Sequence, residues 1–183
     1  MLYYLTALLP KFMHKLTIEE NKTRKELFKQ TNRPRCEVYL ILDNIRSAHN
    51  VGAIFRTCDG AGVSRVYLCG ITPTPPNKEI EKTALGTVDS VPWEYYESSK
   101  ELIIELKSRG VQIVALEITD QSVDYRQFDY MSPTAIVLGN EVEGIEEEVL
   151  ALADSAIEIP MHGMANSLNV ATSAAIIVFY LSK

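Results

Sequence analysis

Short apolar runs alternate with segments of helical periodicity along most of the chain. The runs hold valine, isoleucine and leucine in succession rather than at every second residue, a pattern typical of strands that are buried on both faces of a sheet. We predict strands at VYLILD (38–43), RVYLCG (65–70), VQIVALEI (111–118), TAIVLG (134–139) and SAIEIP (155–160), and an extended segment at VPWEYY (91–96).

The segments between these runs predict helices. Capping residues and glycines mark several of their ends. The predicted helices are 50–62, 77–84, 98–110, 144–153 and 167–182. Strands and helices that alternate in this way indicate an α/β fold, in which a parallel sheet is flanked by helices on both faces.

Three loops at the carboxyl ends of the predicted strands carry unusual residues. In parallel α/β sheets, ligands bind at these ends, in the loops that lead to the next element. The loops are DNIRSAHNVGAIFR (43–56), LGNEVEG (138–144) and IPMHGMANSLN (159–169). We therefore expect the functional site where these three loops meet.

Length and composition are those of a single globular domain. The chain has 183 residues, 46% of them hydrophobic, and no apolar run approaches the roughly 20 residues of a membrane span. The N-terminus lacks the features of a signal peptide, so we expect a cytoplasmic protein without membrane contact. Three widely spaced cysteines, Cys36, Cys58 and Cys69, fit neither a disulfide framework nor a zinc site. We predict reduced thiols and no bound metal.

The charge is unevenly distributed along the chain. The net charge is -6, yet residues 1–35 hold 8 of the 18 basic side chains and only 3 of the 24 acidic ones, so this segment carries +5 and the remainder -11. We therefore treat residues 1–36 as a basic N-terminal helical extension, which we call the basic arm. An arm of this kind can attract a polyanion such as RNA.

A simpler interpretation of the basic arm is a solvated amphipathic helix. Thr17 and Glu20 have the spacing of a capping box at the start of such a helix. Ile18, together with Leu27 or Phe28, would form its buried stripe. The sequence leaves both interpretations of the arm open.

Common nucleotide and hydrolase signatures are absent from the sequence. It holds neither the glycine pattern of dinucleotide-binding folds nor a P-loop, and neither a G-x-S-x-G elbow nor an H-E-x-x-H pair. An enzyme acting on a small molecule would suit the acidic surface, but it gives no reason for the three unusual loops.

Taken in order, three motifs resemble those of the SpoU (TrmH) family of RNA ribose 2'-O-methyltransferases, in the SPOUT superfamily. The motifs are NVGAIFRTCDGAGV (50–63), IVLGNEVEGI (136–145) and IPMHGMANSLNVATSAAI (159–176). The resemblance implies a methyltransferase domain at 37–183 with an α/β-knot fold, whose C-terminal third forms a trefoil knot. It also implies S-adenosylmethionine as cofactor, a homodimer, and tRNA or rRNA as substrate.

The resemblance assigns catalytic roles to Asn50, Arg56, Glu141, Ser167 and Asn169. Arg56 matches an arginine that is thought to activate the 2'-hydroxyl or to hold the adjacent phosphate. Because a guanidinium group rarely loses its proton, we favour phosphate binding. Glu141 is expected to orient Arg56 or the acceptor ribose. Asn50 and Ser167 can instead be N-caps of the helices that follow them.

The resemblance also implies a set of cofactor-binding residues: Leu116, Leu138, Gly139, Asn140, Gly144, Ile159, Met161 and Leu168. Gly139 has no side chain, so the loop after its strand can close around the adenosyl group and read the adenine with backbone groups. For Ile159, core packing is the simpler interpretation. A catalytically inactive, RNA-binding or regulatory protein of the same fold stays open, although all five polar motif residues are present.

Overall fold

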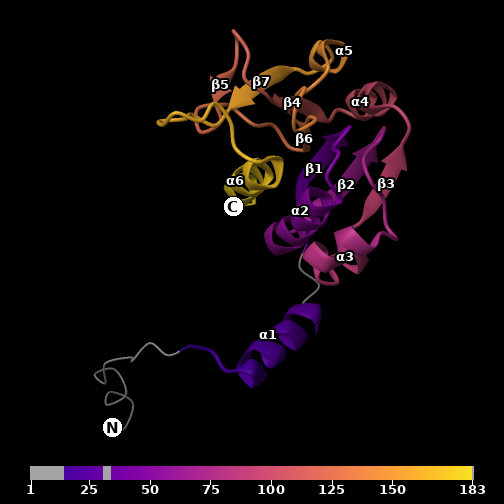
Figure 1. The fold of residues 1–183 in the computed structure, drawn as a ribbon, viewed down its shortest axis with the longest axis vertical. Helices are drawn as coiled ribbons and strands as arrows, with labels where there is room; N and C mark the ends of the chain where they lie inside the picture. Colours follow the sequence, from indigo (N-terminus) through magenta and orange to yellow (C-terminus); the bar gives the residue numbers. More distant parts are fainter. Residues whose placement is uncertain (1–14, 31–33, 183) are drawn as a thin grey trace. The chain divides into compact units, whose positions relative to one another are not determined.

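The computed structural model describes residues 15–30 and 34–182. The chain divides into two units, Met1–Pro34 and Arg35–Lys183. The described part of the first unit contains one helix, α1 (Ile18–Gln30) (Figure 1).

Helix α1 begins with the capping box that the sequence predicts. The Glu20 N–H donates to the Thr17 hydroxyl at 3.2 Å, and the Thr17 N–H donates to the Glu20 carboxylate at 2.7 Å. Ile18, which we expected on a buried stripe, is 91% exposed. The side chains of Leu27 and Phe28, the other members of that stripe, lie outside the described part of the structure.

The second unit is built on a seven-stranded parallel sheet (Figure 1). Its strands are β1 (Cys36–Asp43), β2 (Val63–Cys69), β3 (Trp93–Tyr96), β4 (Gln112–Leu116), β5 (Val123–Asp124), β6 (Thr134–Leu138) and β7 (Ser155–Glu158). They lie in the order β3-β2-β1-β6-β4-β7-β5, and all neighbours are parallel. The predicted α/β fold is confirmed. The apolar pattern missed β5, a two-residue edge strand in a polar loop.

The helices of this unit are close to the predicted ones, with two exceptions. They are α2 (Ala48–Ala61), α3 (Lys78–Ala84), α4 (Ser99–Ser108), α5 (Glu147–Leu150) and α6 (Val170–Leu181), with a 3-10 turn, η1 (Thr87–Asp89). We expected α5 from residue 144 and α6 from residue 167, so both helices begin three residues late. The preceding residues belong instead to loops that line the site.

Helices cover both faces of the sheet and enclose two apolar cores. Leu40 and Leu42 of β1 face α2 and α6, whereas Ile41 between them faces α4 and α5. Cys58 and Cys69 are buried and free, one in each core. Burial raises the pKa of Cys69 to about 12, so this thiol stays protonated and unreactive.

Membrane contact and the trefoil knot are the two remaining expectations about the fold. Among the described residues, no helix is both long and apolar enough to cross a bilayer. The trefoil knot that the resemblance implies stays a prediction.

Candidate active site

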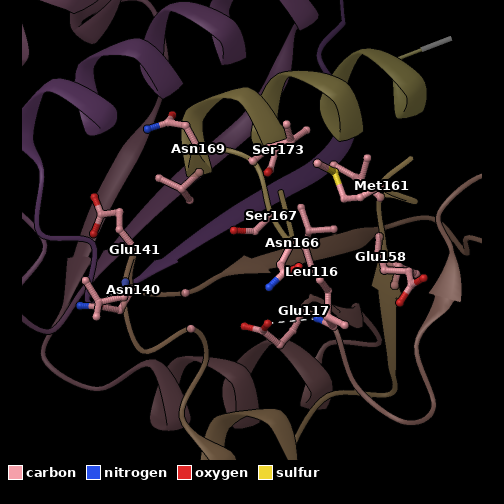
Figure 2. A pocket seen from close by; sticks show the side chains of 18 residues that line it. Leu116, Glu117, Asn140, Glu141, Glu158, Met161, Asn166, Ser167, Asn169 and Ser173 are labelled. Atoms are coloured by element: carbon pink, nitrogen blue, oxygen red, sulfur yellow. Dashed lines mark hydrogen bonds between the residues drawn. The ribbon is translucent and has the colours of Figure 1, made fainter. Parts of the chain in front are cut away.

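A pocket of about 480 Å³ opens at the carboxyl ends of β4, β6 and β7, beside the start of α6 (Figure 2). These three strands are neighbours in the sheet, so the loops that follow them surround one cavity. The position is the one at which parallel α/β sheets bind ligands. We expected all three unusual loops to meet at the site, and two of them, 138–144 and 159–169, line this pocket.

Most of the predicted site residues line this pocket. They are Leu116, Gly139, Asn140, Glu141, Gly144, Ile159, Met161, Ser167, Leu168 and Asn169. Leu138 lies elsewhere: it is buried in the core at the end of β6. Asn50 and Arg56 are not lining residues either. Asn50 is hydrogen-bonded to two residues that are, whereas Arg56 lies apart.

The loop after β6 folds back on itself, which Gly139 and Gly144 permit. A Cβ at Gly139 would lie 2.3 Å from the carbonyl carbon of Gly144, so any side chain would force the loop open. Asn140 and Gly144 exchange two backbone hydrogen bonds, at 3.0 and 2.9 Å, and Gly144 has the positive φ of 73° that favours glycine. The Asn140 side chain donates to the Asn44 carbonyl at 2.9 Å and ties the loop to the end of β1.

The Glu141 side chain is hydrogen-bonded to the loop 43–56, which contains the start of the first motif. Its carboxylate accepts from the backbone N–H of Arg46 at 2.9 Å, from that of Ser47 at 3.1 Å, and from the Asn50 side chain at 2.8 Å. Desolvation raises the pKa of Glu141, but these hydrogen bonds outweigh it and hold the pKa below its ordinary value. In the structure Glu141 therefore orients Asn50 rather than Arg56, and its expected contact with the acceptor ribose stays a prediction.

Asn50 joins the first motif to the third. The N-cap of α2 is Ser47, whose hydroxyl accepts from the Asn50 N–H at 3.3 Å, so the interpretation of Asn50 as an N-cap is wrong. Its side chain instead donates to Glu141, and its Oδ1 accepts from the side chain of Asn169 at 3.1 Å. Glu141, Asn50 and Asn169 thus form a continuous hydrogen-bonded chain, which we call the motif chain.

Asn169 has a second role as the N-cap of α6. Its Oδ1 accepts from the Ala171 N–H at 2.9 Å, while its side-chain nitrogen donates to Asn50. The prediction that Ser167 caps this helix is wrong, because the helix begins at Val170. Ser167 lines the pocket instead (Figure 2).

Arg56 lies apart from the motif chain. It is on α2, six residues after Asn50, a separation of roughly 9 Å along a helix axis. Its exposed side chain borders a separate open hollow with Lys82 and Phe179. No described carboxylate forms an ion pair with it. Four of the five predicted catalytic residues therefore gather at the pocket, and Arg56 does not.

Three carboxylates line the pocket: Glu117, Glu141 and Glu158. Lysine, arginine and histidine are missing from the described residues that line it. The sequence interpretation missed Glu117 and Glu158, although each stands at the carboxyl end of a strand. Across the described ranges, no group of histidine, cysteine, aspartate and glutamate side chains could hold a metal ion.

The comparisons with known sequences agree with the motifs. Residues 37–179 match the SpoU rRNA Methylase family. The chain is similar to the tRNA (guanosine(18)-2'-O)-methyltransferase of Thermus thermophilus, with 36% identity over 156 residues, 85% of this chain and 79% of the relative. It is also similar to the enzyme of that name from Escherichia coli K12, with 36% identity over 143 residues, 78% of this chain and 62% of the relative.

Solved structures show the same likeness. The TrmH/SpoU tRNA modifying enzyme of A. aeolicus superposes with a TM-score of 0.77 at 35% identity, covering 88% of this chain and 82% of that one. An AdoMet-bound rRNA methyltransferase from Sinorhizobium meliloti superposes with a TM-score of 0.74 at 34% identity, covering 81% of this chain and 57% of that one.

Proposed function

Because the chain belongs to the SpoU rRNA Methylase family, we propose that it transfers a methyl group from S-adenosylmethionine to the 2'-hydroxyl of an RNA ribose. A carbon–sulfur bond of the sulfonium breaks and leaves the neutral thioether S-adenosylhomocysteine, a carbon–oxygen bond forms, and the hydroxyl proton passes to solvent. The protein must hold donor and acceptor in line and stabilise the charge that moves. The observation that carries the proposal is the motif chain, which joins one residue of each motif beside the pocket.

The pocket fits a nucleoside donor in size and in lining. Its volume of about 480 Å³ falls within the range of roughly 300 to 1,000 Å³ for small-molecule sites. Leu116, Ile159 and Leu168 offer apolar surface for an adenine ring, and the folded loop that begins at Gly139 offers backbone N–H and C=O groups. When bound, S-adenosylmethionine supplies an electrophilic methyl group on a positively charged sulfur, which suits a pocket whose ionisable side chains are carboxylates.

We assign the acceptor side to the motif chain and Arg56. Asn50 Oδ1 accepts one hydrogen bond, from Asn169, so a second lone pair can accept from the ribose hydroxyl and orient it. Arg56 binds the phosphate beside that ribose through its forked N–H groups. Ser167, which lines the pocket, is assigned to the same acceptor region.

We further propose a homodimer in which a second copy packs against α6. This helix is apolar nearly all round, and Phe179 near its end is 52% exposed. Phe179 also borders the hollow of Arg56, so a copy that covers α6 would enclose this arginine. Sedimentation of the wild type and of Phe179→Asp tests the surface, since a charge at a dimer contact should shift the protein toward monomer.

For the acceptor we propose tRNA, with guanosine 18 as the first nucleotide to test. The relatives from Thermus thermophilus and Escherichia coli are named for that modification, whereas the similar protein of Sinorhizobium meliloti is described as an rRNA methyltransferase. We place the reaction in the cytoplasm, where the sequence predicts the protein and where such an RNA is available.

Transfer of a tritiated methyl group tests the function and the substrate together. The acceptors are an unmodified tRNA transcript, the same tRNA with a 2'-deoxy nucleotide at position 18, and fragments of rRNA. We expect incorporation into the first and none into the second. Incorporation into the rRNA fragments alone would show that the substrate is rRNA and not tRNA. Donor binding without transfer to any RNA would favour the catalytically inactive alternative, which no feature of the site now supports.

A further inference from the structure

Glu117 holds two loops of the pocket together. Its N–H donates to the Ile157 carbonyl at 3.1 Å, which fixes the residue to β7. Its carboxylate accepts from the N–H of Ile118 and from that of Ile145, both at 3.0 Å. A Cβ at Gly144 would lie 2.5 Å from Glu117 Oε2, so the glycine leaves the space that this carboxylate fills.

The negative charge of Glu117 is less compensated than that of Glu141. Glu141 accepts three hydrogen bonds and lies at the start of α2, where the helix dipole favours an anion. Glu117 accepts two, one at each oxygen, and both come from neutral backbone groups. No described cation pairs with it. Because a carboxylate has about four acceptor sites, lone pairs remain that no described residue uses.

Glu117 and Glu158 differ in the groups that their carboxylates bind. Figure 2 shows the carboxylate of Glu117 below Asn166, at the lower edge of the labelled residues, and that of Glu158 at their right-hand edge. Glu158 accepts a hydrogen bond from the Ser122 hydroxyl at 2.5 Å, outside the pocket lining. Glu117 thus keeps both carboxylate oxygens bonded to the loops of a pocket that has no cationic side chain among its described lining residues.

The donor and the product of the proposed reaction differ in charge. S-adenosylmethionine carries a sulfonium, an ammonium and a carboxylate, and loss of the methyl group leaves a neutral thioether in place of the sulfonium. The ligand thus becomes less positive by one charge while the pocket stays unchanged. A fixed anion in a partly desolvated cavity attracts the positive form more strongly than the neutral one.

We infer that Glu117 determines ligand specificity in the pocket by favouring the positively charged donor over its neutral product. The inference rests on the proposed function, because it concerns the same pocket and the same ligand. As a consequence, methyl transfer itself lowers the affinity of the pocket for the bound ligand and so promotes product release.

Titration calorimetry of the full-length protein tests the inference with three ligands: S-adenosylmethionine, S-adenosylhomocysteine, and sinefungin, which carries an amine in place of the sulfonium. In Glu117→Gln, one of the two backbone N–H groups loses its acceptor, so all three ligands should bind more weakly. The charge effect adds to this for the positive ligands alone. We therefore expect the preference for S-adenosylmethionine over S-adenosylhomocysteine to fall about tenfold, and sinefungin to follow S-adenosylmethionine.

Two variants serve as controls. Glu143→Gln removes the same charge from an exposed residue of the neighbouring loop that does not line the pocket, and its preference should match that of the wild type. Glu117→Asp keeps the charge and shortens the side chain, so it should weaken all three ligands and retain the preference. If Glu117→Gln does not fold, the salt dependence of binding to the wild type provides the test. Added salt should weaken binding of S-adenosylmethionine more than binding of S-adenosylhomocysteine.

The outcomes separate this inference from the function on which it rests. An unchanged preference in a folded Glu117→Gln, or equal salt dependence of donor and product in the wild type, would overturn the role of Glu117 and leave it a purely structural residue. Failure of the wild type to bind any of the three ligands would overturn the proposed function instead.

Discussion

The donor pocket and the hollow around Arg56 belong to the same unit, yet they are built in different ways. The pocket is held by internal hydrogen bonds: its loop closes over Gly139, and Glu141 is fixed by three donors. The hollow is open, and the exposed side chain of Arg56 borders it without a described carboxylate partner. Preorganised groups bind at a smaller entropic cost than mobile ones. In the proposed function, the donor side is thus held by hydrogen bonds within one chain, while the acceptor side depends on what binds there.

The sharpest test of this contrast is Arg56→Ala. If Arg56 acts only on the RNA, methyl transfer should fall about 10²- to 10³-fold, the usual effect of removing one group that stabilises a transition state. The affinity for S-adenosylmethionine should stay within twofold of the wild type. Single-turnover transfer and calorimetry on the same preparation measure the two quantities.

Arg56→Lys is the matched control for charge. Lysine keeps the positive charge but cannot form the two parallel hydrogen bonds of a guanidinium. We expect transfer between that of the wild type and that of the alanine variant. Loss of donor affinity in either variant would place Arg56 on the donor side and remove the contrast between the two regions.

A second test breaks the pocket and leaves the hollow intact. Gly139→Ala places a methyl group 2.3 Å from the Gly144 carbonyl carbon, closer than real Cβ contacts allow. The loop must open, so affinity for the donor should fall about 100-fold, or about 2.7 kcal/mol. Gly163→Ala is the control, since a Cβ there would meet no atom within 4 Å. Donor affinity that is equal in the two variants would show that the closed loop is not needed for binding.

The sequence predicted the pocket better than it predicted the contacts within it. Gly139, Asn140 and Glu141 could be placed because a glycine-rich loop after a buried strand marks the ligand edge of a parallel sheet. The motif chain could not, because its bonds join residues 91 and 119 positions apart. Pairings over such distances follow from the packing of α2 and α6 against the sheet, which local patterns do not encode.

Helix starts were ambiguous for a local reason. The segment that includes Ser47 and Asn50 offers two good N-caps three residues apart, and the loop before α6 offers Ser167 and Asn169. Local propensity does not choose between the members of each pair, and in the structure Ser47 caps α2 and Asn169 caps α6. Because Ser47 caps α2, the side chain of Asn50 does not cap the helix and is hydrogen-bonded to Glu141 and Asn169 instead. The wrong start predicted for α2 therefore also hid the role of Asn50 in the motif chain.

The basic arm extends the comparison to RNA binding. The remainder of the chain carries -11, so it repels a polyanion at long range, and the arm is the main source of compensating charge. Deletion of residues 1–30 should weaken tRNA binding about tenfold and flatten its salt dependence by roughly 0.7 to 0.9 units for each phosphate that the arm no longer neutralises. Donor affinity should not change. Filter binding over a range of salt concentrations measures the slope.

A double substitution serves as the control for the removal of helix α1 in the deletion. Lys15→Gln with Lys22→Gln removes two exposed charges and keeps the capping box of α1. The slope should fall by a smaller amount in the same direction. An unchanged slope in the deletion would mean that the arm is a solvated helix and that basic residues of the second unit bind the RNA.

The smallest expected effect concerns the charge of Glu141, the residue that fixes the donor side to α2. Its pKa is lower in the folded protein than the ordinary value of 4.5, so ionised Glu141 stabilises the fold above that value, and the contribution is lost as the pH falls through the lowered pKa. Glu141→Gln should be less stable than the wild type in urea at pH 7, and the difference should shrink below about pH 4.5. Glu143→Gln, which removes an exposed charge outside the pocket lining, is the control for the change in net charge. A difference between wild type and Glu141→Gln that stays constant with pH would mean that hydrogen-bond geometry, rather than the negative charge, holds the motif chain together.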